Sequence, residues 1–197
     1  KAAFLYDIAV VERPFINIDP KSVHLYIGIP FCRSRCLYCS FTSYPVERHR
    51  SLIPAFMDAL EKEIRFVKKM VDENKLRIKS VYIGGGTPTA LDNSSLDRVL
   101  QLVNESFDIK NAEFTVEAGR PDTITYEKLN TMKMNNITRI SINPQTMNAS
   151  TLKAIGRNHT PEEVVEKFKI SRDMGFDNIN MDIIAGLPNE EIGRAHV

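Results

Sequence analysis

The chain has 197 residues, of which 43% are hydrophobic and 26% are charged, and its formal net charge is +1. This composition is typical of one globular domain with a sizeable core. The near-neutral charge gives no indication of a nucleic-acid-binding surface, and no apolar run approaches the roughly 20 residues of a membrane span. We therefore expect neither a nucleic-acid partner nor a transmembrane segment.

Both ends of the chain are expected to lie outside the folded core. Residues 1–20, which include Pro14 and Pro20, are interpreted as the tail of an upstream region or as a linker. Residues 192–197 (IGRAHV) match the translation of a common sequencing adapter, so we interpret them as non-native rather than as a chance match. Residues 21–191 then form an incomplete core, whose native continuation is expected to differ after about Asn189.

Short β-rich runs alternate along the chain with amphipathic helical segments, which is typical of βα units around a parallel sheet. Strands are predicted at 23–29, 80–86, 113–118, 137–142 and 178–186, and helices at 53–71, 95–107, 126–134 and from 161 onward. Two helix starts have capping signals: Ser94 with Asp97, and Thr160 with Pro161 and Glu163. Five βα steps followed by a stop predict an α/β fold that is an unfinished barrel.

The only three cysteines, Cys32, Cys36 and Cys39, lie within eight residues, on the loop that leaves the first predicted strand. Thiolates are preferred ligands of iron–sulfur clusters and of zinc. A four-iron cluster normally takes four cysteines, so three would leave one iron open to a small molecule. A zinc site with His49 as fourth ligand and inert buried thiols are the alternatives, and the spacing favours a cluster because zinc motifs usually contain two ligand pairs.

A run of glycines, GGGTPT at 84–89, follows the second predicted strand. Residues without a Cβ allow backbone N–H and C=O groups to approach a ligand closely. Without other evidence the run would be interpreted as a tight turn. Its position near the cysteine loop makes a binding site the stronger interpretation.

Polar residues accompany the later strands: Glu117 ends the third, Gln145 follows the fourth, and Asp182 lies within the fifth. Each alone could be a helix cap, a loop hydrogen bond or a solvated group. Asp182 lies in an otherwise apolar strand, and a buried carboxylate needs a partner. Since the active site of a parallel barrel lies at the carboxyl ends of its strands, we expect one shared site there.

The strings GIPFCRSRCLYCSF, GGGTPT, TVEAGRPDTI, RISINPQTMN and INMDIIAGLP together resemble the radical S-adenosylmethionine (SAM) superfamily, and within it the oxygen-independent coproporphyrinogen III dehydrogenase branch. The similarity extends from about Val23 to Pro188. It implies a partial (β/α)6 TIM-barrel-like core, here truncated after about the fifth strand. It also implies a [4Fe–4S] cluster held by Cys32, Cys36 and Cys39, with SAM chelating the open iron.

The same resemblance implies a set of residues that contact SAM: Tyr26, Tyr38, Gly84, Gly85, Thr87, Glu117, Gln145, Arg157 and Asp182. In this assignment the glycines, Thr87 and Glu117 contact the methionine part, and Arg157 pairs with its carboxylate. Gln145 and Asp182 hold the ribose hydroxyls. The two tyrosines pack near the sulfonium and the adenine.

The implied reaction begins when an electron cleaves the sulfonium to give a 5′-deoxyadenosyl radical. The radical would take hydrogen from the propionates of coproporphyrinogen III, and loss of carbon dioxide and an electron would leave vinyl groups. An electron donor such as flavodoxin or ferredoxin, a tetrapyrrole substrate and a cytoplasmic location are implied. The fragment itself is expected to be inactive, because the substrate pocket is expected to depend on absent C-terminal segments.

Two positions depart from the branch pattern. Members with demonstrated activity carry His where this chain has Gly28, and a further Cys where it has Phe41. Haem-chaperone relatives also lack that cysteine, so a haem-trafficking protein without coproporphyrinogen oxidation is the alternative function. A zinc-stabilised structural module is the third.

Overall fold

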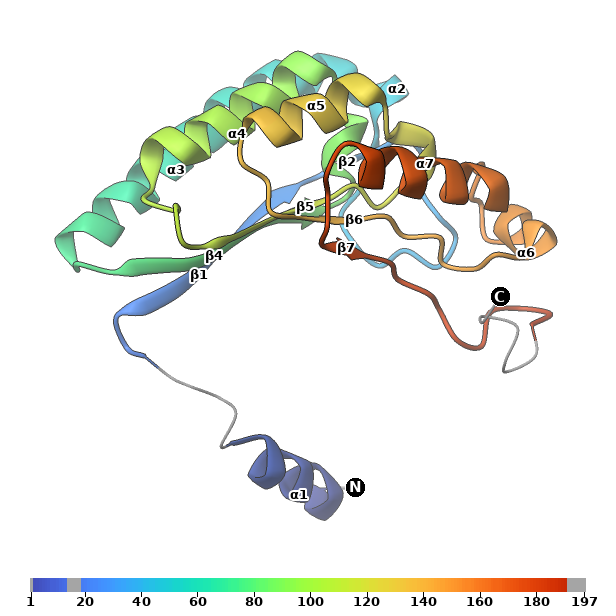
Figure 1. The fold of residues 1–197 in the computed structure, drawn as a ribbon, viewed down its shortest axis with the longest axis horizontal. Coiled ribbons are helices and arrows are strands. Elements are labelled where there is room, and N and C mark those ends of the chain that lie inside the picture. Colours follow the sequence, from blue (N-terminus) through green and yellow to red (C-terminus); the bar gives the residue numbers. More distant parts are fainter. Residues whose placement is uncertain (1, 14–18, 191–197) are drawn as a thin grey trace.

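The computed structural model describes residues 2–13 and 19–190, and its main sheet has five parallel strands (Figure 1). In spatial order these are β1 (Ser22–Ile29), β4 (Arg77–Gly85), β5 (Glu113–Glu117), β6 (Arg139–Ser141) and β7 (Ile179–Asn180). Each strand after β1 pairs with the strand of this sheet that comes before it in the sequence. Parallel barrels are built in the same way. The five predicted parallel strands and the α/β class are confirmed.

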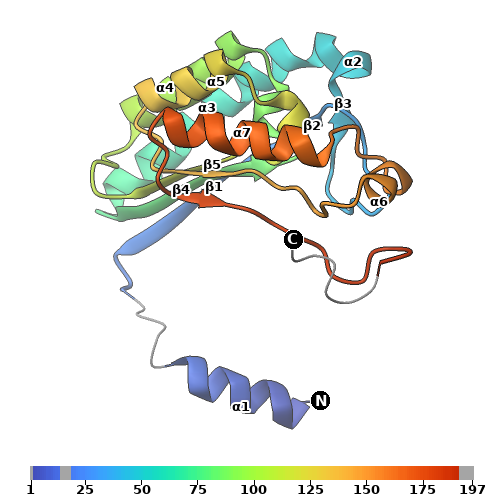
Figure 2. The ribbon, with the colours of Figure 1, turned by 45° about the vertical axis from the view of Figure 1, so that its right-hand side comes forward.

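The long helices cover one face of this sheet, as Figures 1 and 2 both show. They are α3 (Ile53–Glu73), α4 (Asn93–Ser106), α5 (Tyr126–Met134) and α7 (Pro161–Asp173). Shorter elements, most of them near the carboxyl ends of the strands, are α2 (Val46–His49), α6 (Ala149–Ala154), and the 3₁₀ helices η2 (Arg50–Leu52), η3 (Pro88–Ala90) and η4 (Pro121–Thr123). Val81, Val116 and Ile140 are fully buried strand residues of the core that these helices cover.

The opposite face of the sheet, which would line the interior of a barrel, is polar. Across this face the strand register aligns Gly28 with Gly84, and Glu117 with Ser141 and then with Asn180. Bulky branched side chains usually fill the interior of such barrels. Two glycines and three polar side chains in one row instead leave room near the carboxyl ends of the strands.

Three details differ from the sequence-based expectations. Helix α4 is capped by Asp92, whose Oδ1 accepts a hydrogen bond from the Ser95 backbone N–H at 2.8 Å, so the predicted box of Ser94 with Asp97 is wrong. Strand β7 is shorter than the predicted 178–186, because beyond Asn180 the chain makes only an isolated bridge between Ile183 and Gln145. A second, two-stranded sheet was not predicted; it pairs β2 (Phe31–Cys32) with β3 (Tyr44–Pro45).

The segment interpreted as a tail or linker contains a helix, α1 (Ala2–Glu12), which both views place apart from the sheet (Figures 1 and 2). The residues interpreted as an adapter, 192–197, lie outside the described residues. None of the helices described is both long enough and apolar enough to cross a membrane.

Candidate metal and cofactor site

The three cysteines line one cavity of about 100 Å³ at the carboxyl ends of the parallel strands. Cys32 and Cys36 are buried, Cys39 is half-buried, and none of them forms a disulfide. The pairing of β2 with β3 fixes Cys32, and a turn in which the Cys39 N–H donates to the Cys36 carbonyl at 3.1 Å fixes the other two. The loop therefore presents free thiols to a shared space.

Polar side chains contact two of these thiols. The Sγ of Cys32 lies 3.2 Å from the Oγ1 of Thr87, and the Sγ of Cys36 accepts a hydrogen bond from the Nη1 of Arg120 at 3.6 Å. Within residues 2–13 and 19–190, no three His, Cys, Asp or Glu side chains converge on a position for one metal ion. A four-iron cluster does not need such convergence, because each thiolate binds a different iron.

His49, the candidate fourth zinc ligand, is engaged elsewhere. Its Nδ1 lies 3.0 Å from the carbonyl oxygen of Pro45, and its ring packs against Tyr44 with centroids 5.1 Å apart. His49 is not among the residues that line the cavity with the cysteines. The arrangement therefore does not support a zinc site made of the three thiols and this imidazole.

The glycine run passes against the backbone that leads to Cys32. Gly85 has φ of +103°, in the left-handed region that favours glycine, and a Cβ on Gly86 would lie only 2.4 Å from the carbonyl oxygen of Phe31. The Thr87 N–H donates to the same Phe31 carbonyl at 2.7 Å. The absence of side chains at Gly85 and Gly86 thus brings the backbone to the cavity wall.

Arg157 joins the cysteine loop to two strand ends. Its Nε and Nη2 donate to the Oη of Tyr38 at 3.2 and 3.1 Å, and its Nη1 donates to the carbonyls of Gly119 and Asn143 at 3.0 and 3.3 Å. Arg157 and Tyr38 both line the cavity. Burial raises the pKa of Tyr38, and the nearby charge of Arg157 opposes that shift. A cation is therefore held at the cavity wall.

Glu117 supplies a negative charge at the same cavity, from the end of β5. Burial raises the pKa of this half-buried carboxyl, and the charge of Asp182 raises it further. The Oε1 of Glu117 accepts a hydrogen bond from the Nδ2 of Asn143 at 3.3 Å. Burial, together with the charge of Glu117, raises the pKa of Tyr82 to about 12. The carboxylate is therefore positioned by neutral groups and can bind a cationic ligand.

Gln145 and Asp182 are neighbours, but their surroundings differ. Gln145 is buried with φ of +67° and lines the cavity, and its N–H donates to the carbonyl oxygen of Asp182 at 3.0 Å. Asp182 is exposed, and its Oδ1 accepts a hydrogen bond from Asn180 at 2.7 Å. The expectation of a buried carboxylate at Asp182 is therefore wrong, because β7 ends at Asn180 and leaves the next residues at the edge of the sheet.

Most of the predicted site residues meet at this cavity: Cys32, Cys36, Cys39, Tyr38, Gly85, Thr87, Glu117, Gln145 and Arg157. Three do not line it: Tyr26, Gly84 and Asp182. Tyr26 is exposed on β1 and stacks on Tyr82 with ring centroids 5.9 Å apart. A Cβ on Gly84 would lie 2.6 Å from the Tyr82 ring and 2.7 Å from the Glu117 carboxylate, so Gly84 leaves room for both side chains.

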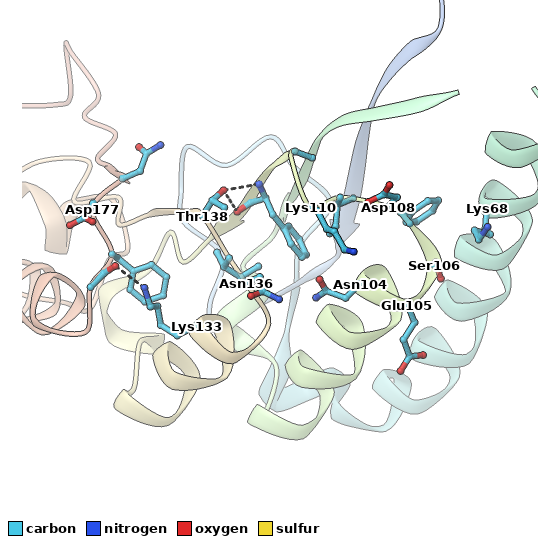
Figure 3. A pocket seen from close by; sticks show the side chains of 18 residues that line it. Lys68, Asn104, Glu105, Ser106, Asp108, Lys110, Lys133, Asn136, Thr138 and Asp177 are labelled. Carbon is cyan, nitrogen blue, oxygen red and sulfur yellow. Dashed lines mark hydrogen bonds between the residues drawn. The ribbon is translucent and has the colours of Figure 1, made fainter. Parts of the chain in front are cut away.

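A wider hollow of about 1050 Å³ lies at the other end of the sheet, around the amino ends of β5, β6 and β7 (Figure 3). Its charged side chains include Lys110, Asp108 and Lys133, and the Nζ of Lys133 donates to the Gly175 carbonyl at 2.7 Å. None of the predicted site residues lines this hollow. That end of a barrel usually serves stability rather than catalysis.

The model of the Radical SAM superfamily matches residues 26–195. The chain belongs to this superfamily. Among curated proteins, this radical SAM chain is similar to the "oxygen-independent coproporphyrinogen-III oxidase-like protein HemZ" of Bacillus subtilis (strain 168), with 46% identity over 190 residues. That match covers 95% of the chain and 38% of the relative.

Other relatives have different names. The "heme chaperone HemW" of Bacillus subtilis (strain 168) is 34% identical over 171 residues, which cover 85% of this chain and 43% of that protein. The solved coproporphyrinogen III oxidase HemN of Escherichia coli superposes with a TM-score of 0.76 at 27% identity, over 86% of this chain and 38% of that one. The chain thus spans about two fifths of the length of these relatives.

Radical SAM proteins use a [4Fe–4S] cluster and S-adenosylmethionine. The residues around the cavity fit these groups: three free thiols, backbone exposed by two glycines, a carboxylate and a guanidinium. The thiols can hold the cluster, and the charged side chains match the ammonium and carboxylate groups of SAM.

Two buried residues of this radical SAM site, Arg120 and Asn143, were not predicted from the sequence, and both line the cavity. Arg120 lies three residues after Glu117, within the string AGRPD that contributed to the resemblance. Because Arg120 lies just beyond the end of β5, as a site residue would, its position in the sequence could have identified it as a candidate. Asn143 follows β6 in the same way, but an amide at a strand end is too common to stand out.

Proposed function

We propose that this radical SAM chain is the cluster-bearing part of an oxygen-independent coproporphyrinogen III dehydrogenase, which converts propionates of the substrate to vinyl groups in haem biosynthesis. The observation that carries the radical chemistry is the cavity in which three thiols, Glu117 and Arg157 meet. The 46% identity to the HemZ protein over 95% of this chain supports the substrate class.

Within this proposal, Cys32, Cys36 and Cys39 would hold the cluster, with one iron left for the amino and carboxylate groups of SAM. When bound, the cluster would supply the electron for the reductive cleavage of SAM. Arg157 orients the carboxylate of SAM: its four protein hydrogen bonds leave one of its five N–H groups for a ligand. Glu117 accepts a hydrogen bond from the amino group of SAM.

The remaining contacts follow the resemblance. Gly84, Gly85 and Thr87 are proposed to face the methionine part, and Gln145 with Asp182 to hold the ribose. For Asp182 this role is consistent with its exposed carboxylate beside the buried Gln145. The aromatic residues Tyr26 and Tyr38 are proposed to pack near the sulfonium and adenine. A flavodoxin or ferredoxin is the proposed electron donor, and the cytoplasm the proposed location.

A haem-trafficking protein is the second candidate function, and specific observations favour it. The HemW chaperone is 34% identical to the chain, and Phe41 lines the cavity where members active on coproporphyrinogen have a further cysteine. Gly28 lies on β1, and a Cβ there would be 3.5 Å from the Tyr26 ring, an ordinary contact. A Cβ at this position is therefore sterically allowed, yet the chain lacks the histidine of active members.

The experiment that separates these functions is an anaerobic assay of the full-length protein with coproporphyrinogen III, SAM and a reductant, followed by product analysis. The proposal predicts that vinyl-bearing product and 5′-deoxyadenosine form together, and that the Cys36→Ala variant forms neither. Stoichiometric haem binding without decarboxylated product, at full cluster occupancy, would reject the dehydrogenase and support the haem-trafficking function.

A further inference from the structure

The guanidinium group of Arg120 is buried against the cysteine loop. Arg120 is only 2% exposed, and its Nη1 lies 3.1 and 3.0 Å from the carbonyl and hydroxyl oxygens of Ser34 and 3.6 Å from the Sγ of Cys36, so that its two hydrogens are shared among three acceptors. Arg120 follows β5 and lies 84 residues from Cys36 in the sequence. A charged donor from another element is thus aimed at one of the three thiols.

Asp122 fixes the direction of this guanidinium. Its two carboxylate oxygens accept hydrogen bonds from the Nε and Nη2 of Arg120 at 3.1 and 3.2 Å, so the pair is bidentate. Asp122 also contacts Arg33 of the cysteine loop: its Oδ2 lies 3.3 Å from the Arg33 Nε, and its carbonyl accepts from the Arg33 Nη1 at 3.0 Å. The third nitrogen of Arg120, Nη1, is therefore the one directed at the loop and at Cys36.

The charge of Arg120 is sustained in this buried place. A guanidinium stays protonated in proteins, and the bidentate pair with Asp122 offsets the cost of burying its charge. Solvent screens a charge pair weakly when both partners are buried, and Cys36 and Arg120 both are. Solvent therefore weakens the effect of the cation on the sulfur only slightly, and the Asp122 carboxylate is the charge that opposes it.

We propose that Arg120 is a positioning residue that raises the reduction potential of the cluster bound by Cys36, through its N–H···S hydrogen bond and its charge. Hydrogen bonds to the sulfurs and nearby charge set such potentials, and the reduced cluster carries one more negative charge than the oxidised cluster. A cationic donor stabilises the reduced state more. This inference rests on the cluster assignment of the proposed function and is independent of the substrate.

Arg120, Asp122 and Arg33 also hold the cysteine loop in place, so a purely structural role for Arg120 has to be distinguished from electrostatic tuning. If the variants only loosened the loop, replacing Arg120 and replacing Asp122 would shift the reduction potential in the same direction. Electrostatic tuning predicts opposite signs, since Arg120→Gln removes a positive charge and Asp122→Asn removes a negative one. Arg33→Gln is the matched control, because Arg33 shares the Asp122 contact, is 54% exposed and has no hydrogen bond to a thiol among the contacts described.

The test is a redox titration of the reconstituted protein and its variants without SAM, followed by electron paramagnetic resonance. We expect Arg120→Gln to lower the ratio of reduced to oxidised cluster about tenfold at the wild-type midpoint potential. For a one-electron couple this corresponds to a downward shift of the midpoint by about 59 mV. Asp122→Asn is expected to shift the midpoint upward, and Arg33→Gln to stay within about twofold of wild type.

A wild-type midpoint in Arg120→Gln, or equal downward shifts in Arg120→Gln and Asp122→Asn, would overturn the proposal. If Arg120→Gln assembles no cluster, Asp122→Asn decides instead, because it keeps the guanidinium and removes only the opposing negative charge. An upward shift of the midpoint in Asp122→Asn supports the proposal, and an unchanged or lowered midpoint overturns it. Failure of the wild-type protein to bind iron would reject the cluster assignment itself, which is a separate outcome.

Discussion

Two buried arginines, Arg120 and Arg157, bring positive charge to the cysteine loop. Each keeps its guanidinium buried by filling most of its N–H groups: Arg157 with two carbonyls and the Tyr38 hydroxyl, and Arg120 mainly with Asp122 and Ser34. Burying an unpaired charge would cost several kcal/mol, so these contacts are needed before either residue can serve a ligand. The fold thus maintains cations beside the three cysteines.

His159 is a third buried basic residue near this cluster of charges, and it is kept neutral. It is 3% exposed, and its Nε2 lies 3.2 Å from the carbonyl oxygen of Pro144. Burial lowers its pKa to about 4, and the charge of Arg157 contributes to the shift. Protonation of this imidazole is therefore coupled to unfolding.

We expect the free energy of unfolding to fall as the pH drops from 6.5 to 4, because the unfolded chain then binds a proton at His159 that the folded chain does not. The full effect is about 3 kcal/mol, from the distance between the ordinary pKa and about 4. His159→Gln, which can still donate to the Pro144 carbonyl, should flatten this dependence. Urea unfolding of both proteins between pH 7 and pH 4.5 measures it, and parallel curves would contradict the assignment.

Helix α7 shows how local signals set the start of an element. The Oγ1 of Thr160 accepts a hydrogen bond from the Glu163 N–H at 3.2 Å, and the Oε2 of Glu163 accepts one from the Thr160 N–H at 2.8 Å. Pro161 occupies the first helical position. The predicted capping box is confirmed, and it places α7 directly after the segment that contains Arg157 and His159.

Replacing Thr160 by Ala should lower the free energy of unfolding by about 1 kcal/mol, because the Glu163 N–H loses the side-chain oxygen that accepts its hydrogen bond. Thr160→Ser keeps the hydroxyl and is the matched control, expected within about 0.5 kcal/mol of wild type. Denaturant melts of the three proteins provide the comparison. Equal midpoints for Ala and Ser would show that the box contributes nothing at this position.

At the scale of elements, the sequence predicts the start or end of a helix or strand correctly where local chemistry sets that boundary. The bounds of α5, 126–134, were predicted correctly, and the structure shows a local cap at its start, where the Thr125 hydroxyl accepts a hydrogen bond from the Lys128 N–H at 3.2 Å. The cap of α4 was not, because Asp92, Ser94 and Ser95 are adjacent candidates and only backbone geometry selects among them. The end of β7 depends on the lack of a further neighbour in the described sheet, which no residue type reveals.

The candidate site was predictable to a similar extent. The spacing of the cysteines and the glycine run are local features, and both reach the cavity. The contact between Arg120 and Cys36 joins residues 84 positions apart, and it depends on how η4 packs against the cysteine loop. Such a contact leaves no periodic trace in the sequence. The exposure of Asp182 was missed for the same reason, because it follows from the position of β7 at the edge.

At the scale of the molecule, one arrangement explains both the fold and the chemistry. Parallel strands deliver the glycine run, Glu117 and Gln145 to the same end, where the cysteine loop returns after β1. The helices bury the apolar face, so the polar face remains available to ligands (Figure 1). The central claim is that three thiols, rather than four, hold a cluster whose open iron binds SAM.

The measurement that tests this claim most directly is the electron paramagnetic resonance spectrum of the anaerobically reconstituted and reduced protein, recorded with and without SAM. We predict a [4Fe–4S]⁺ signal that changes when SAM is added, and no such signal in the Cys36→Ala variant. A protein that binds zinc and no iron, or a full cluster signal that persists in Cys36→Ala or is unchanged by SAM, would contradict the account.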